Sequence, residues 1–184
     1  YRVIVVTSSV PGEGKSTTSG NLAIALAQSG NSVLLVDCDM RKPSIHKKFK
    51  ISNAAGTAEL LLRKKLFEEV ANKYNENLTI ITAGKIPPNP SEMLASRAMT
   101  AFIEEMKKEF KYIILDTPPL QAVTDAQVLS TKADGVLLVV RAGSTKREMV
   151  LNSVDLIKKV QGKVIGTVLN GVENKKNNYY YYGE

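Results

Sequence analysis

The sequence has few of the residues that build disulfide or zinc sites. Its 184 residues include no tryptophan, one histidine and one cysteine. With Cys38 alone, no disulfide can form within the chain, and a reducing compartment is favoured. His46 cannot build a zinc site by itself. No apolar run approaches the roughly 18 residues of a membrane-spanning helix, and no secretory signal is visible.

The residues that are present describe a globular protein of one domain. Hydrophobic residues make up 43% of the chain and charged residues 23%, which excludes wholesale disorder. Lysine and arginine outnumber the acidic residues by 25 to 18, and the net charge of +7 favours an acidic partner. Nucleotide phosphates, nucleic acid and an anionic membrane surface all remain open. The chain begins with Tyr1 rather than Met, so we expect an excised part of a longer protein.

Short apolar runs alternate with amphipathic stretches of helix length. The runs predict strands over 3–7, 33–37, 78–83, 112–116, 135–141 and 163–170. The stretches predict helices over 16–29, 57–64, 66–74, 124–131 and 145–161, and one helix or two over 91–109. This alternation predicts the α/β class: a doubly wound, mostly parallel sheet with helices on both faces, over 1–170. Residues 171–184 lack apolar periodicity and are expected to form a flexible tail. Such folds bind ligands at the carboxyl ends of their strands.

A glycine-rich segment separates the first predicted strand from the first helix. Gly12 and Gly14 allow backbone N–H groups to converge on phosphate oxygens, and the following helix adds its positive dipole end. Lys15 is expected to reach the β- and γ-phosphates, and Ser16 to offer its hydroxyl to Mg²⁺. The segment is therefore a P-loop, with Ser9 where the usual pattern has its first glycine. The candidate nucleotide-binding residues are Gly12, Glu13, Gly14, Lys15, Ser16 and Thr17.

The main alternative for this segment is a dinucleotide-binding turn. Gly12-x-Gly14 is followed by Asp37 at about the spacing that such turns require. The third glycine of that pattern is missing, because Thr17 stands there. The alternative also leaves Lys15 and Asp39 without a task, so we prefer the P-loop.

Acidic residues follow two other predicted strands. Asp37 closes the strand over 33–37 and Asp39 comes just after it, while Asp116 closes the strand over 112–116. In a parallel sheet they lie at the same edge as the P-loop, where carboxylates can hold Mg²⁺. A single aspartate after a strand is more often a turn or helix cap, but three beside a P-loop favour function. One of them is free to orient or deprotonate a nucleophile; whether Asp37 is that base or a metal ligand stays open. Lys15 and these three aspartates are the catalytic candidates.

Three further features have simple structural interpretations. Thr145 and Glu148 have the spacing of a capping box, and Asp125 is expected to cap the helix over 124–131. Arg41 and the lysines up to residue 50 form a basic stretch beside the site. It is a solvated face, or a contact with a neighbouring subunit or an acidic substrate.

Three motifs resemble those of the bacterial tyrosine kinases, P-loop proteins that work with capsule and exopolysaccharide machinery. They are a Walker A motif at 9–16, a Walker A′ motif at 34–41 and a Walker B motif at 113–118. A fourth matching feature is the tyrosine cluster at the end of the chain, formed by Tyr179, Tyr180, Tyr181 and Tyr182. Walker A alone is shared by very many NTPases, whereas Walker A′ combined with a tyrosine tail is far more specific.

The resemblance implies an ATP- and Mg²⁺-dependent protein-tyrosine kinase. It implies Lys15 on the phosphates, with Ser16, Asp39 and Asp116 around the metal. It suggests that Asp37 accepts or orients the incoming tyrosine hydroxyl. The four clustered tyrosines are the implied phosphoacceptors. Asn170 matches a position that usually contacts adenine in related ATPases.

The resemblance also implies partners and a place in the cell. The expected partners are a membrane-anchored activator, as a separate protein or an upstream domain, and further copies of the chain in a ring. No nucleic acid partner is expected. The kinase would be cytoplasmic, held at the inner face of the membrane by its activator, and would regulate polysaccharide synthesis or export.

Two other functions remain as alternatives. One is a partitioning-type ATPase that binds DNA or membrane; such proteins usually have lysine at the position of Val10. The other is a scaffold for the polysaccharide machinery that binds ATP without using it.

Overall fold

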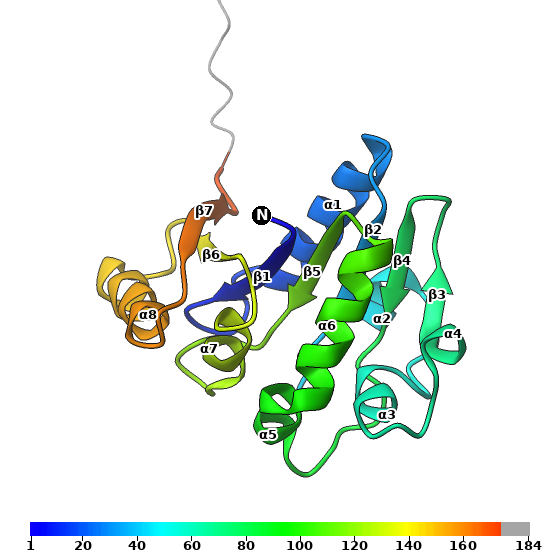
Figure 1. Ribbon diagram of the computed structural model, residues 1–184. Helices are drawn as coiled ribbons and strands as arrows, with labels where there is room; N and C mark the ends of the chain where they lie inside the picture. The colour runs from blue at the N-terminus through cyan, green and yellow to red at the C-terminus, as the bar shows by residue number, and fades with distance from the viewer. Residues whose placement is uncertain (174–184) are drawn as a thin grey trace, which may run out of the picture.

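The structure, a computed structural model, describes residues 1–173 (Figure 1). The predicted phosphoacceptors at 179–182 lie outside the described residues, as does most of the predicted tail. Among the residues that are described, no helix has the length and apolar character needed to cross a membrane.

Within residues 1–173, seven strands form one sheet in the order β3-β4-β2-β5-β1-β6-β7. Their bounds are β1 Val3–Ser8, β2 Val33–Asp37, β3 Ala71–Lys73, β4 Leu78–Ile81, β5 Tyr112–Asp116, β6 Gly135–Arg141 and β7 Val164–Asn170. Only the β3–β4 pair is antiparallel; the other five pairs are parallel. The register sets Asp37 of β2 opposite Asp116 of β5. The predicted doubly wound α/β fold is confirmed.

Helices cover both faces of the sheet (Figure 1). Their bounds are α1 Lys15–Gln28, α2 Ile45–Phe49, α3 Thr57–Leu61, α4 Phe67–Val70, α5 Pro90–Ala95, α6 Arg97–Glu109, α7 Asp125–Ser130 and α8 Arg147–Lys159. α1 and α2 pack on one face, while α3 and α5–α8 supply apolar side chains to the core on the other. Strand β2 contributes to both cores, since Leu34 and Val36 face one and Val33 and Leu35 the other. This explains why its sequence is continuously apolar.

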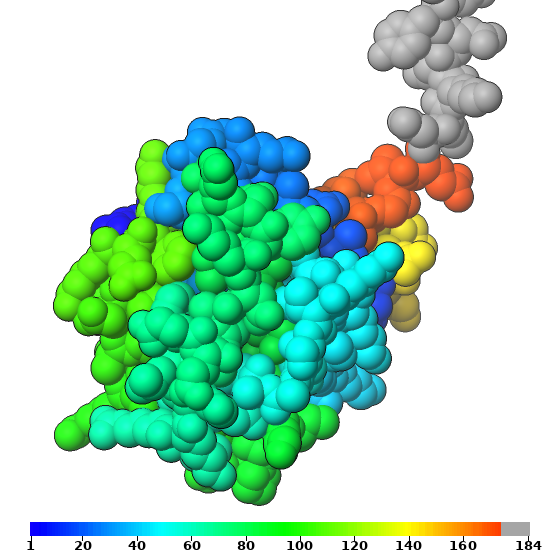
Figure 2. Space-filling view, turned by 90° about the vertical axis from the view of Figure 1, so that its right-hand side faces the viewer, coloured from blue at the N-terminus to red at the C-terminus, as the bar shows by residue number. Residues whose placement is uncertain are grey.

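The helix predicted over 66–74 is wrong beyond residue 70. The helix there, α4, ends at Val70, and Ala71–Lys73 form the edge strand β3 beside β4. A turn makes this pairing possible, because the Asn75 side chain accepts hydrogen bonds from the N–H groups of Asn77 and Leu78. Pairing with β4 satisfies backbone groups that would otherwise be left at the sheet edge. In Figure 2 the segment from α2 to β3, coloured cyan to teal, covers this end of the molecule.

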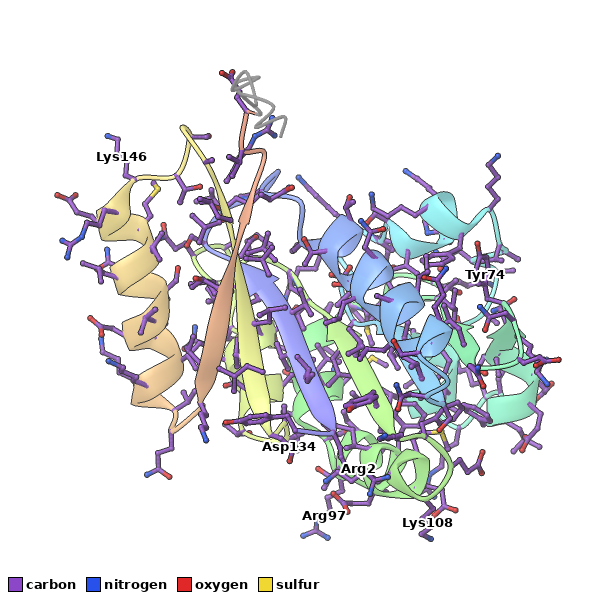
Figure 3. All side chains as sticks on the ribbon, turned by 90° about the horizontal axis from the view of Figure 1, so that it is seen from above. Arg2, Tyr74, Arg97, Lys108, Asp134 and Lys146 are labelled. Atoms are coloured by element: carbon purple, nitrogen blue, oxygen red, sulfur yellow. The ribbon has the colours of Figure 1, made fainter. Side chains whose placement is uncertain are left out.

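The candidate site lies at the end of the sheet where the parallel strands end. Where β1 and β6 begin, the N–H of Arg2 donates to the Asp134 carboxylate over 2.7 Å. Lys146, which follows β6, lies at the opposite end (Figure 3). The P-loop and all three candidate aspartates belong to that second end, because each follows or closes a parallel strand. The predicted meeting of these segments at one edge is confirmed.

Candidate functional site

The P-loop has the backbone that its sequence predicts. Strand β1 ends at Ser8 and α1 begins at Lys15. Gly12 and Gly14 adopt φ angles of 84° and 95°, in the left-handed region that favours glycine. Gly14 is required for a second reason besides its φ angle, because an added Cβ would overlap the Asn170 amide nitrogen. The loop therefore curls tightly into α1 and leaves the helix N-terminus at the sheet edge.

Lys15 is held by an aspartate of the Walker A′ segment. Its Nζ lies 2.9 Å from Asp39 Oδ2, and both side chains are largely buried. Nζ is also 3.4 Å from the Ser16 hydroxyl oxygen. Burial acts to lower the pKa of Lys15, but the carboxylates of Asp116 and Asp39 outweigh it and raise the pKa above its ordinary value. Lys15 therefore stays cationic, as a phosphate-binding group must.

Asp116 is fully buried and only half satisfied. Its Oδ1 accepts the Ser19 hydroxyl over 2.8 Å, while Oδ2 has no hydrogen-bond partner among the described residues. Burial raises the pKa of Asp116, and the Lys15 cation opposes that shift. A buried carboxylate oxygen without a partner is costly, which indicates that a further ligand belongs there.

The donor set fits Mg²⁺. No group of three or more His, Cys, Asp or Glu side chains that could hold a metal alone occurs within residues 1–173. Mg²⁺ does not need such a group, because it takes one or two carboxylates and completes its shell with phosphate oxygens and water. The free Asp116 oxygen and the Ser16 hydroxyl are oxygen donors of that kind.

Asp37 has a task that the sequence did not suggest. Its Oδ1 accepts the N–H of Asp39, and its Oδ2 accepts the N–H groups of Ser44 and Ile45, over 3.1–3.3 Å. The side chain is fully buried. Burial, followed by the nearby Asp116 carboxylate, raises the pKa of Asp37 to about 8. Asp37 thus ties down the loop that presents Asp39 to Lys15.

An ion pair beside the site, between the buried Asp125 carboxylate and the partly exposed Arg41 guanidinium, was not predicted from the sequence. Asp125 was expected to cap α7, but the structure has Thr124 at the N-cap, and Asp125 accepts a forked pair of hydrogen bonds from Arg41 over 3.0 and 3.1 Å. The Ser91 hydroxyl donates to the same carboxylate. The basic stretch is therefore not simply a solvated face, since Arg41 joins the Walker A′ loop to α5 and α7.

The remaining candidates also lie at this edge. The Asn170 side chain donates to the backbone carbonyl of Glu13 over 2.9 Å, so the end of β7 touches the P-loop. The Thr17 hydroxyl accepts a hydrogen bond from Lys48. The Glu13 carboxylate accepts the Thr145 hydroxyl. That bond replaces the predicted capping box, because α8 begins at Arg147 without a side-chain cap.

A pocket of about 270 Å³ opens between the P-loop, the loop after β2 and the segment after β5. Its lining includes the charged side chains of Lys15, Asp39 and Arg41 and the apolar side chains of Pro118 and Val123. The pocket therefore combines charged groups that suit a phosphate with apolar surface that suits an aromatic ring.

Comparisons with known proteins find similar chains over nearly the whole length of this one. A model of the AAA domain family matches residues 1–169. The tyrosine-protein kinase YwqD of Bacillus subtilis is 41% identical over 182 residues, which cover 98% of this chain and 77% of the relative. The putative tyrosine-protein kinase CapB of Staphylococcus aureus is 39% identical, covering 98% and 81% respectively. The kinase domain of the Escherichia coli tyrosine kinase ETK superposes with a TM-score of 0.91 at 33% identity, covering all of this chain and 72% of that one.

Proposed function

We infer the reaction from a premise that the comparisons establish: the chain belongs to the bacterial tyrosine-protein kinases, with the P-loop NTPase fold. We propose that it transfers the γ-phosphoryl group of ATP to tyrosine hydroxyls, including those of its own C-terminal cluster. The observation that carries this proposal is the meeting of Lys15, Asp39 and the free Asp116 oxygen beside the P-loop. A phosphoryl-transfer site needs positioning and charge stabilisation of this kind.

Each charged side chain has a proposed role. Lys15 would bind the β- and γ-phosphates, with its pKa raised so that it stays cationic. Ser16 and Asp116 would hold Mg²⁺, and Asp39 would stand in its outer shell. Mg²⁺, when bound, neutralises charge on the β- and γ-phosphate oxygens. Asn170, beside Gly14, would contact the adenine side of the nucleotide.

The acceptor hydroxyl needs a group to take its proton. An unperturbed tyrosine has a pKa near 10, so its oxygen is a weak nucleophile at neutral pH. The tyrosine oxygen forms a bond to the γ-phosphorus, the bond to the β–γ bridging oxygen breaks, and ADP leaves. We assign the hydroxyl proton to Asp37 because of its place at the end of β2, opposite Asp116. Taking up the proton requires Asp37 to be ionised and its buried carboxylate to become accessible to the acceptor hydroxyl.

The position of β7 supports the tail as substrate. The strand ends at Asn170, in contact with the P-loop, so the chain leaves the sheet at the rim of the site. Fourteen further residues, fully extended, reach roughly 45–50 Å. We propose that Tyr179–Tyr182 are phosphorylated in this way, between subunits.

The wider setting is proposed from the family. We place the kinase in the cytoplasm at the inner face of the membrane, bound to an activator protein or domain. Further copies of the chain would assemble with it, and it would regulate the synthesis or export of a capsular or extracellular polysaccharide. A nucleic acid partner is not part of this proposal.

One experiment tests the proposed reaction. The chain is incubated with Mg-ATP, and phosphate is mapped by mass spectrometry. We expect phosphate on Tyr179–Tyr182, lost in Lys15→Met and kept in the control Lys158→Met, whose side chain is exposed on α8. ATP hydrolysis with unmodified tyrosines would instead favour the partitioning-type ATPase, and neither activity would favour the scaffold.

A further inference from the structure

Glu13 is a buried carboxylate in the middle of the P-loop. Only 2% of the residue is exposed. Its Oε2 accepts the N–H of Val10 over 2.8 Å, within the loop itself. Its Oε1 accepts the Thr145 hydroxyl and, over 3.3 Å, the N–H of Arg141. One carboxylate thus joins the P-loop to the loop between β6 and α8.

Two more contacts hold the same stretch of backbone. Arg141 Nη1 donates to the carbonyl oxygen of Gly12 over 3.1 Å. Asn170 donates to the carbonyl oxygen of Glu13 over 2.9 Å, and the Asn170 carbonyl accepts the N–H of Ala142. The ends of β6 and β7 therefore fix two consecutive carbonyls of the P-loop.

Fixing these carbonyls also fixes two N–H groups. In a planar trans peptide the C=O and the following N–H point in opposite directions. Holding the carbonyls of Gly12 and Glu13 therefore orients the N–H groups of Glu13 and Gly14 away from β6 and β7. These are the groups that a P-loop directs at phosphate oxygens.

A negative charge at the position of Glu13 is unfavourable for phosphate binding. A carboxylate beside a phosphate-binding loop repels the anion that the loop binds. That cost is offset only if the carboxylate does something that a neutral side chain cannot. Glu13 does so here, because both of its oxygens accept N–H or O–H donors and neither donates.

We propose that Glu13 is a positioning residue for nucleotide binding. Together with Thr145 and Arg141 it clamps the P-loop in its phosphate-binding conformation, which makes the β6–α8 loop part of the nucleotide site. This proposal rests on the proposed function, because it concerns how the same site binds ATP.

The substitution Glu13→Gln separates a clamp from a simple charge. Glutamine keeps the shape but puts an NH₂ group on one of the two sides. Against Val10 it meets an N–H, which is a donor–donor contact. On the other side the Thr145 hydroxyl must turn to accept it, and the Arg141 N–H loses its carboxylate acceptor. We expect the Kd for Mg-ADP, measured by calorimetry on the whole chain, to rise about tenfold or more. The KM for ATP should rise by a similar factor, with a smaller change in kcat. If Glu13 acted only through its charge, the same substitution would tighten binding.

Thr145 provides a second variant at the edge of the clamp. Thr145→Val removes the hydroxyl donor and should weaken Mg-ADP binding several-fold, whereas Thr145→Ser keeps the donor and should preserve affinity. In the double variant Glu13→Gln/Thr145→Val the losses should be less than multiplicative, because both act through one contact. Glu148→Gln, exposed on the first turn of α8, is the matched control and should change nothing.

Several outcomes would overturn the clamp. They are unchanged or tighter Mg-ADP binding by Glu13→Gln, equal losses in the serine and valine variants of Thr145, and multiplicative losses in the double variant. Urea unfolding of each variant shows whether it still folds. If Glu13→Gln does not fold, the comparison of Thr145→Val with Thr145→Ser decides whether the clamp exists. If the unchanged chain bound no Mg-ADP, the proposed function itself would fall; binding that Glu13→Gln leaves intact overturns the clamp alone.

Discussion

The substitution Arg41→Ala should destabilise the fold by leaving a buried carboxylate without its cation. Asp125 has a fully buried side chain, and Arg41 donates to both of its oxygens over 3.0 and 3.1 Å. The pair joins the loop after β2 to the first turn of α7. Removing the guanidinium leaves the Ser91 hydroxyl as the remaining side-chain donor that the structure describes for that carboxylate.

The magnitude follows from the burial of the two partners. Breaking a buried ion pair by removing one partner typically costs about 3–5 kcal/mol. The loss should be smaller here, because Ser91 still donates and the Arg41 side chain is 38% exposed, so water can enter its place. We therefore expect the free energy of unfolding to fall by about 2–3 kcal/mol. With a urea m-value of about 2 kcal/mol/M, the midpoint of unfolding should fall by about 1–1.5 M.

Urea unfolding of the nucleotide-free chain measures this effect. Arg97→Ala is the control, because Arg97 is exposed and forms no ion pair with any residue from 1 to 173. Asp125→Asn added to Arg41→Ala should recover part of the loss, since it removes the uncompensated charge. A loss below about 0.5 kcal/mol for Arg41→Ala, or no recovery in the double variant, would refute the reasoning.

Three further predictions concern the same edge of the sheet. Burial raises the pKa of Asp37 to about 8, from an unfolded value near 4. Its contribution to stability is therefore complete below about pH 4 and is lost as the pH rises through 8. The free energy of unfolding, measured at pH 5, 7 and 9, should fall with rising pH, and this fall should be smaller in Asp37→Asn. Gly14→Ala should weaken Mg-ADP binding and stability more than Gly12→Ala, because an added Cβ overlaps Asn170 only at position 14; equal losses would contradict this. The thiol of Cys38 is fully buried and burial raises its pKa, so a thiol reagent should label it only after unfolding, and fast labelling of the native chain would be the contrary result.

The parts of the site that depend on local chemistry could be predicted from sequence. The P-loop could be predicted because its glycine requirement is local. Gly12 and Gly14 adopt positive φ angles, which favour glycine whatever residues surround them. The meeting of Asp37 with Asp116 was predicted because a parallel sheet brings the carboxyl ends of its strands to one edge, and the register of β2 and β5 confirms it. The boundary of the tail and the phosphoacceptor tyrosines stay predictions.

The errors occurred where a local signal competed with a distant partner. Thr145 and Glu148 had the spacing of a capping box, yet the Thr145 hydroxyl donates to Glu13, 132 residues away. Asp125 had the position of a helix cap, yet its carboxylate binds Arg41, 84 residues away. The stretch over 66–74 had a helical pattern, yet Ala71–Lys73 complete the sheet edge.

The sequence by itself determined the fold class, the phosphate loop and the set of acidic groups at one edge of the sheet. Periodicity, glycine placement and strand-terminal aspartates act over a few residues, so they can be recognised before folding is considered. Only the tertiary structure decided which side chains hold those groups in place. Each of three contacts joins segments that are far apart in the sequence: the clamp on Glu13, the Arg41–Asp125 pair and the Asn170 contact. No local sequence pattern predicts such contacts. They form because packing buries polar groups that must then find partners in whichever loop lies beside them.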